Sequence, residues 1–301
     1  MKLEDGRQSD NIEDRRGQGD DGGGGGGGIG GVLGSGGHLG LGAIVILGII
    51  GYALGIDPRV LISGVESIQG GGQQTSQPVQ NSSQPPANDQ TKRFVSAILG
   101  ETEDVWGQVL PAQKNIRYVN PKLVLFNVQT NSECGGKAVA AMGPFYCPVD
   151  QKVYLDTSFF AEMKSKYGGG GDFAYAYVIA HEIGHHVENL LGILPKIQQL
   201  QEQARTKQEA NGYSVRVELM ADCLAGVWAA NANQKWQILE PGDVEKAMAT
   251  AQAIGDDRLQ TASRGYAVPD SFTHGSSVDR QKWLTTGLKT GTIDSCMPLM
   301  Q

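Results

Sequence analysis

The sequence predicts an α+β domain over residues 91–301 that is mainly helical and has a small β-sheet. Three segments place apolar residues at helical spacing: 94–110 (FVSAILGETEDVWGQVL), 172–193 (DFAYAYVIAHEIGHHVENLLGI) and 212–230 (GYSVRVELMADCLAGVWAA). In the second segment apolar residues surround almost the whole helix, which is typical of a helix buried in a core. We therefore expect this helix at the centre of the domain, crossed by the third.

Two short segments are predicted to form strands that pack against the central helix. Residues 123–130 (LVLFNVQT) and 151–159 (QKVYLDTSF) are rich in β-branched and aromatic side chains, as strands commonly are. Asp172 follows a glycine loop and is the expected N-cap of the central helix.

Composition excludes some classes of function. The net charge is −7 and the chain has no run of lysine or arginine, so a nucleic-acid partner is not expected. The seven consecutive glycines at 22–28 lack the preceding strand, the spacing and the Lys-Ser/Thr of a phosphate-binding loop.

Residues 1–38 are charged and glycine-rich, and they precede an apolar stretch over residues 39–56. As a helix, this stretch would be about 27 Å long, enough to cross a bilayer core with slight help from its flanks. A buried core helix should carry a polar face, and a signal peptide should begin closer to the N-terminus. We therefore expect a single transmembrane helix.

The expected orientation follows from basic residues near this helix. Lys2, Arg7, Arg15 and Arg16 precede it, whereas Arg59 is the only basic residue between it and Lys92. The positive-inside rule then places the N-terminus in the cytoplasm and the domain on the extracytoplasmic side of the membrane. Residues 57–90 are rich in Gln, Ser, Gly, Asn and Pro, which predicts a disordered linker.

The four cysteines all follow the expected transmembrane helix, so an oxidising compartment favours two disulfides. Cys134 and Cys147 are the close pair, which leaves Cys223 with Cys296. Zinc ligation by cysteine is the alternative, but closely spaced cysteine pairs are missing from the sequence.

The hexapeptide HEIGHH at 181–186 predicts a catalytic zinc site. His181 and His185 are four residues apart, so both imidazoles lie on one helix face and can reach one Zn²⁺ ion. Glu182 lies beside that face, where its carboxylate can take a proton from water. His186 points elsewhere and is expected to pack or support a ligand, and Gly184 would let another segment approach closely.

A catalytic zinc needs a third protein ligand, and Glu218 is the expected one. Asp222, four residues later on the same helix face, is expected to fix the tautomer of a ligand imidazole. Two alternatives remain: Asp222 as the ligand, or a solvent-facing acidic pair. Glu188 is a weaker candidate because it lies nearly two turns beyond His181.

Four stretches, HEIGHHVENLLGI, SVRVELMADCLAGVWA, GPFYCPVDQKVYLD and THGSSVDRQKWL, together resemble the neutral zinc metallopeptidase family, the YpfJ-type proteins, which are bacterial and membrane-anchored. HExxH followed by ExxxD is also similar to the gluzincin peptidases, and this implies a zincin-like fold with Glu218 as ligand and Asp222 as support. The interval between His185 and Glu218 is longer than in compact gluzincins. Residues 196–210 (KIQQLQEQARTKQEA) are expected to fill it with an additional helix.

The resemblance also implies roles for His274 and Arg280, near the start of a helix that Ser276 or Ser277 could cap. His274 would stabilise the oxyanion and Arg280 would orient it or the substrate. The alternatives are a surface histidine and a structural arginine paired with an acid.

The expected function is hydrolysis of a peptide or protein substrate by a membrane-anchored zinc metallopeptidase, with Glu182 as general base. The strand at 152–156 (KVYLD) is a candidate edge strand for pairing with an extended substrate. The alternative is a non-catalytic zinc-binding factor for envelope assembly, or a chaperone-like one. The sequence does not specify the substrate or the oligomeric state.

Overall fold

A computed structural model describes residues 1–3, 7–17, 89–134, 136–166 and 170–300 of the chain. The expected transmembrane helix at 39–56 and almost all of the expected linker lie outside these residues. Within the described part, no helix is both long and apolar enough to cross a membrane.

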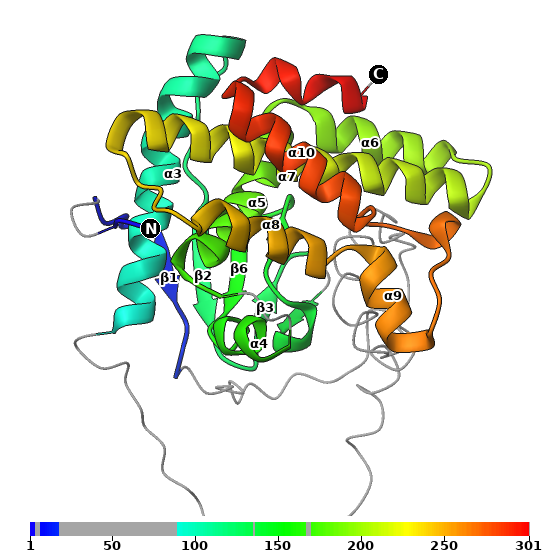
Figure 1. The fold of residues 1–301 in the computed structure, drawn as a ribbon, viewed down its shortest axis with the longest axis horizontal. Helices are drawn as coiled ribbons and strands as arrows, with labels where there is room; N and C mark the ends of the chain where they lie inside the picture. Colours follow the sequence, from blue (N-terminus) through cyan, green and yellow to red (C-terminus); the bar gives the residue numbers. More distant parts are fainter. Residues whose placement is uncertain (4–6, 18–88, 135, 167–169, 301) are drawn as a thin grey trace, which may run out of the picture.

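The domain is mainly helical with a small sheet, as the sequence predicted (Figure 1). The helices are α3 (Gln90–Lys114), α4 (Phe159–Lys166), α5 (Asp172–Leu190), α6 (Ile193–Gln203), α7 (Lys207–Trp236), α8 (Asp243–Ala253), α9 (Asp256–Arg264) and α10 (Ser277–Thr290). The strands are β1 (Ile12–Asp14), β2 (Lys122–Phe126), β3 (Gln129–Ser132), β4 (Gly136–Val139), β5 (Phe145–Cys147) and β6 (Lys152–Asp156). Short 3₁₀ turns are η2 (Ala140–Met142), η3 (Pro269–Ser271), η4 (Ile293–Ser295) and η5 (Met297–Met300).

The main sheet has the strand order β1-β2-β6-β5, and β3 and β4 form a separate hairpin. β1, β2 and β6 are parallel, whereas β5 runs antiparallel to β6. The expectation that KVYLD is an edge strand is wrong, because β6 pairs with β2 on one side and with β5 on the other. The outer strand β5 is itself fully buried, so it does not present an open edge either.

The predicted strand over residues 123–130 divides into β2 and the start of β3. Val128 interrupts it with a φ of 68°, a left-handed conformation that a β-branched residue rarely adopts. Asp156, at the end of β6, accepts a hydrogen bond from the Val128 N–H at 2.6 Å and so stabilises this turn. The strand pattern contains no local signal for the break, because the partner lies 28 residues away.

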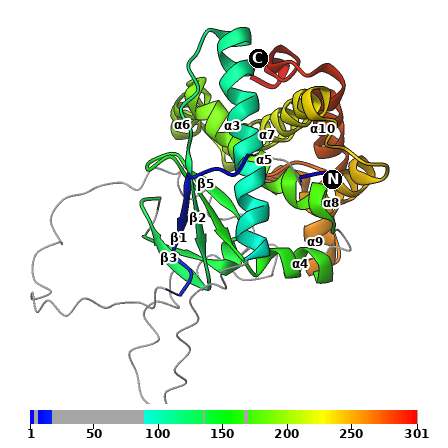
Figure 2. The same cartoon turned by 90° about the vertical axis from the view of Figure 1, so that its left-hand side faces the viewer.

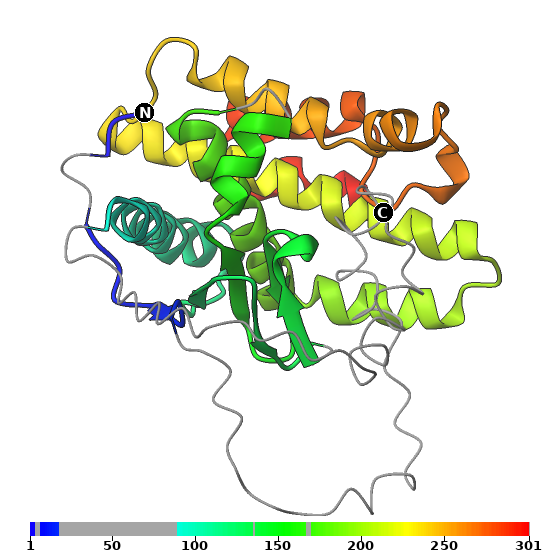
Figure 3. The same cartoon turned by 90° about the horizontal axis from the view of Figure 1, so that it is seen from below.

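Helix α5 lies at the centre of the core, as its apolar surface predicted, and packs against α7, α8, α3 and α6. In Figures 1 and 3, α3 lies on one side of the sheet and the α6–α7 hairpin extends on the other. This hairpin occupies the long interval between His185 and Glu218. The expected additional helix over 196–210 is divided between α6 and the first turn of α7.

Two glycine contacts set the helix crossings around α7. A Cβ atom on Gly184 of α5 would lie 3.0 Å from the Ala221 carbonyl oxygen, so Gly184 allows the close approach that the sequence suggested. A Cβ atom on Gly287 of α10 would lie 1.9 Å from the Cys223 carbonyl oxygen, so α10 is in direct backbone contact with α7.

Both predicted disulfides are confirmed, with Cys134 bonded to Cys147 and Cys223 bonded to Cys296. The first connects the β3–β4 hairpin to β5. The second closes a sequence separation of 73 residues and attaches the C-terminal turns to α7. A loop of this length is expected to constrain the unfolded chain by about 4 kcal/mol.

Residues 1–3 and 7–17 pack on the domain, and β1 adds a strand beside β2 (Figure 2). The sequence patterns did not predict this strand, because residues 1–38 were expected in another compartment from the domain.

Glu101 of α3 is a buried carboxyl group that should make the stability of the domain depend on pH. Its side chain is buried, and its Oε2 has no hydrogen-bond partner in the described part of the chain. Burial, with a smaller contribution from Asp104, raises the pKa of Glu101 to about 7. The folded state therefore binds this proton more tightly than the unfolded state, so Glu101 lowers stability progressively as pH rises from about 4.5 to 7.

Glu101→Gln removes that ionisation and keeps the side-chain shape. We expect it to raise the free energy of unfolding by about 2 to 3 kcal/mol at pH 8 and to change it little at pH 4. Denaturant unfolding at both pH values measures this free energy, and Glu202→Gln at an exposed position of α6 is the control. An equal effect of Glu101→Gln at both pH values would contradict the assignment.

Candidate metal centre

The site is built on the second half of α5. This helix is capped by Gly171, with a φ of 112° and no side-chain cap. Asp172, the expected N-cap, is instead the first helical residue, where its charge still favours the helix N-terminus. The segment from His181 to Glu188 is entirely buried, so each of its polar side chains needs a partner or a ligand.

The structure brings together His181, His185 and Glu218. One ligand atom from each lies within 4.8 Å of the others, and all three residues are buried. The Nε2 atom of His181 is 3.2 Å from one Glu218 oxygen, and the Nε2 atom of His185 is 3.5 Å from the other. The α5–α7 crossing thus aims both imidazoles at the same carboxylate.

Asp222 stands behind this cluster and not within it. Its Oδ1 is 2.9 Å from His181 Nδ1 and also accepts a hydrogen bond from the Tyr177 hydroxyl at 2.6 Å. Arg280 donates to both Asp222 oxygens at 2.9 Å, from Nε and Nη2. Asp222 is therefore the hydrogen-bond partner of the His181 ring, and Arg280 compensates the buried charge of Asp222.

Glu188 is the corresponding hydrogen-bond partner of the His185 ring. Its Oε2 is 2.8 Å from His185 Nδ1, and its side chain is fully buried. The sequence interpretation treated Glu188 only as a weak candidate ligand. Its position three residues after His185 on the same helix was the available signal, since residues at this spacing are neighbours on a helix surface.

These contacts fit a zinc ion. Each Nδ1–H can donate to a carboxylate, which leaves the Nε2 lone pairs directed at Glu218. Two imidazoles and one carboxylate are a ligand set of catalytic zinc sites, where the fourth position stays open to water or substrate.

The electrostatics of the cluster also favour a cation. Burial opposes protonation of His181, but its hydrogen bonds to Asp222 and Glu218 prevail and raise its pKa to about 9. Burial likewise opposes ionisation of Glu218, yet His185 and His181 hold its pKa well below the ordinary value. Positive charge is thus stabilised where the three side chains meet, and a divalent cation bound there would supply it.

Glu182 and His274 lie beside this cluster. Glu182 is 7 % exposed, and burial raises the pKa of its carboxyl group. His274 is also buried, and the next residue, Gly275, packs against the side chain of Leu219, the neighbour of Glu218 on α7. The structure therefore does not support the alternative of an ordinary surface histidine.

Asp256 positions His274 and was missed by the sequence interpretation. Its Oδ1 is 3.1 Å from His274 Nδ1, and its Oδ2 accepts three backbone N–H bonds, from Thr273, His274 and Gly275. Asp256 is the first residue of α9 and lies 18 positions before His274, a separation at which no periodic pattern links two residues.

Arg280 lies in the first turn of α10, which is capped by Ser276, one of the two expected caps. Its guanidinium contacts Asp222 and Tyr177. Arg280 therefore acts through Asp222, and the alternative of a structural arginine paired with an acid describes it better than contact with substrate.

His186 is outside the cluster, as expected. Its Nδ1 is 3.0 Å from the Tyr146 hydroxyl, and its Nε2 is 2.6 Å from the Val119 carbonyl oxygen. Burial lowers the pKa of His186 to about 4, so the ring is neutral and joins α5 to the sheet.

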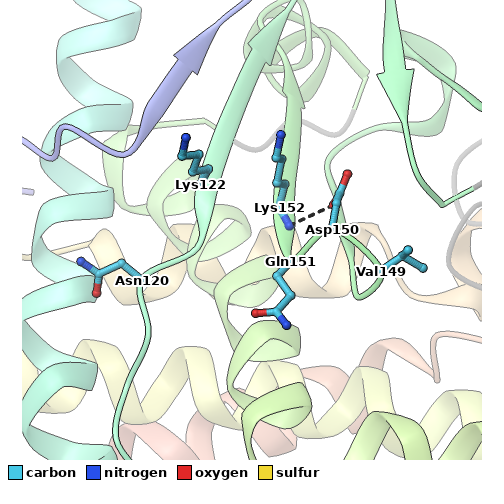
Figure 4. A pocket seen from close by; sticks show the side chains of 6 residues that line it. All are labelled: Asn120, Lys122, Val149, Asp150, Gln151 and Lys152. Atoms are coloured by element: carbon cyan, nitrogen blue, oxygen red, sulfur yellow. Dashed lines mark hydrogen bonds between the residues drawn. The ribbon is translucent and has the colours of Figure 1, made fainter.

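A separate hollow of about 350 Å³ lies at the start of β2 and β6 (Figure 4). It is lined by Asn120, Lys122, Val149, Asp150, Gln151 and Lys152. The three clustered ligand residues do not contribute to it, so this hollow is not the metal centre.

Comparisons with known proteins agree with this site. A family model described as Putative neutral zinc metallopeptidase matches residues 1–299. The uncharacterized protein YpfJ of Escherichia coli K12 is 47 % identical over 297 residues, which cover 98 % of each chain. An uncharacterized protein of Mycobacterium tuberculosis H37Rv is 44 % identical over 212 residues, covering 67 % of this chain and 68 % of the relative. No solved structure matches the chain.

Zinc retention tests the three ligands. His181→Ala and Glu218→Ala should each lower zinc affinity by roughly a hundredfold or more, since each removes a ligand. Glu182→Gln and the control His186→Gln, on the same helix, should retain about one zinc per chain. Metal analysis of the purified full chain measures this. Full zinc content after Glu218→Ala, with loss after Asp222→Ala, would exchange the roles of the two acids.

The carboxylates behind the ligands should differ in their effect on stability. Asp222→Asn leaves the buried Arg280 without its counter-charge, which is expected to cost about 3 to 5 kcal/mol of unfolding free energy. It should also lower zinc affinity about 10- to 100-fold. Glu188→Gln is the matched control: its amide oxygen can still accept the hydrogen bond from His185 Nδ1–H, and the change leaves no arginine without a counter-charge, so the loss of stability should be smaller. Equal losses of stability in the two variants would contradict this account.

Proposed function

Because the chain belongs to the neutral zinc metallopeptidase family, we propose that it is a zinc-dependent peptidase that hydrolyses peptide bonds in protein or peptide substrates. The observation that supports this most strongly is the position of Glu182, next to His181 in sequence and buried beside the cluster. A site that only bound zinc would not need a carboxylate there.

In the proposed reaction, the oxygen of a water molecule adds to the scissile carbonyl carbon and the C–N bond then breaks. Zinc, when bound by His181, His185 and Glu218, supplies a Lewis acid that makes this water more acidic. Glu182 accepts the proton of the attacking water and returns it to the leaving amine nitrogen. The raised pKa of Glu182 suits this role, because the carboxyl group must hold the proton between the two steps.

His274 is proposed to stabilise the negative charge that develops on the carbonyl oxygen. Its Nδ1 is held by Asp256, so Nε2 is the atom available for this contact. Asp256 is a positioning residue: its three backbone hydrogen bonds fix the loop that carries His274.

We propose that the peptidase acts at the extracytoplasmic face of the bacterial cell membrane. The apolar segment 39–56 supports membrane attachment on sequence grounds alone. The two disulfides support an oxidising compartment for the domain, because they are rare in reducing ones.

The catalytic roles can be tested with the full chain purified in detergent, each variant being matched for zinc content. Glu182→Gln should lower turnover of an unfolded protein or a peptide library by roughly a hundredfold or more, with little change in KM. His274→Ala should lower turnover about 10²- to 10³-fold. His186→Gln, whose ring is neutral and outside the cluster, should leave turnover within a few-fold of the native value.

The same variants separate a peptidase from a binding protein. If Glu182→Gln supported the cellular role of the native protein fully, and native protein cleaved neither substrate, the peptidase proposal would be overturned. A zinc-binding envelope factor would then account for the site.

A further inference from the structure

Residues 7–17 lie along α3 and then beside β2 (Figure 2). Ser9 and Ser96 exchange two hydrogen bonds: the Ser9 N–H donates to the Ser96 carbonyl at 3.0 Å, and the Ser96 hydroxyl donates to the Ser9 carbonyl at 2.8 Å. A Cβ atom on Gly100 would lie 2.2 Å from the Arg7 carbonyl oxygen. Gly100 therefore leaves the space in which this N-terminal backbone lies.

A buried charge depends on the same segment. Glu103 of α3 is only 5 % exposed, and its carboxylate accepts hydrogen bonds from Arg7, from the Ser9 hydroxyl at 2.6 Å and from the Asn11 amide at 2.7 Å. All three donors belong to the N-terminal segment. The segment thus both covers this carboxylate and supplies its hydrogen-bond donors, so a substitution that removes one donor while the segment stays docked is destabilising.

The segment also completes the sheet. β1 pairs in parallel with β2 over residues 12–14, the Leu123 N–H donates to the Asn11 carbonyl at 2.9 Å, and the Arg15 N–H donates to the Leu125 carbonyl at 2.8 Å. Removing β1 would expose the edge of β2, whose residues 123–126 are all buried.

The points at which the chain leaves the domain and returns to it lie together. Arg16 forms ion pairs with Asp14 and with Asp89, and Asp89 is the N-cap of α3. The chain between residues 17 and 89 thus starts and ends at the same place on the domain.

These contacts cannot form if residues 39–56 cross a membrane once, because a single crossing would separate the N-terminal segment from the domain. We infer that residues 7–17, docked against α3 and β2, lie on the same side of the membrane as the metal centre.

The three arginines that contributed to the prediction of a cytoplasmic N-terminus have carboxylate partners in the structure. Arg7 pairs with Glu103 and Asp104, Arg15 with Glu13, and Arg16 with Asp14 and Asp89. Their charges stabilise the docked segment, which is an alternative reason for their presence beside the apolar stretch.

Thiol labelling of the full chain in spheroplasts tests this inference. Gln8→Cys places a thiol on an exposed position of the N-terminal segment, and Gln199→Cys places one on exposed α6. The four native cysteines are bonded and do not react. A membrane-impermeant maleimide is added before or after the membrane is permeabilised, and both variants should become labelled under the same condition.

The outcome is decisive in either direction. Labelling of Gln199→Cys before permeabilisation, with labelling of Gln8→Cys only afterwards, would overturn the inference. If both variants were labelled only after permeabilisation, the inference would be supported, but the extracytoplasmic location proposed above would be contradicted. The two proposals can therefore be distinguished by this experiment.

A stability measurement tests the docking itself. Arg7→Ala should lower the melting temperature of the full chain in detergent by about 5 °C or more, since it removes a partner of buried Glu103. Lys2→Ala, which removes an exposed cation from the same segment, is the matched control and should change it little. Equal, negligible effects of the two variants would contradict docking.

Discussion

The close crossing of α5 and α7 is the constraint on which the metal centre depends. At Gly184 the backbone of α7 approaches to a distance that a side chain would prevent, and this contact lies between His181 and His185 in sequence. It brings Glu218 within reach of both imidazoles, with Asp222 one turn further along α7. A larger residue at position 184 would separate the helices and enlarge the cluster, even with every ligand still present.

Buried charge links this crossing to the rest of the domain. Asp222 is fully buried and needs Arg280, which α10 carries. The backbone contact at Gly287 fixes α10 against α7, and the Cys223–Cys296 disulfide attaches the C-terminal turns one residue from Asp222. The arginine therefore contributes to the site from a distance, because it allows a carboxylate to remain ionised behind a ligand histidine in an apolar core.

The parts of the structure that the sequence predicted are those with local causes. The spacing of His181 and His185 and the apolar surface of α5 are properties of one helix, and the two disulfides followed from only four cysteines. Asp256 and the turn at Val128 depend on partners 18 and 28 residues away, which no periodicity records. β1 is the extreme case, since its partner β2 lies more than 100 residues later and parallel pairing leaves no turn signal between the strands.

The N-terminal segment shows why a charge rule and a packing pattern can disagree. The positive-inside rule counts arginines near an apolar stretch and takes them to be free, whereas Arg7, Arg15 and Arg16 are paired with carboxylates of the folded domain or of their own strand. A paired cation has little net charge to present to the translocation machinery once the segment has folded. The side on which such a segment resides then depends on whether docking precedes membrane insertion, a kinetic competition that the count of basic residues does not describe.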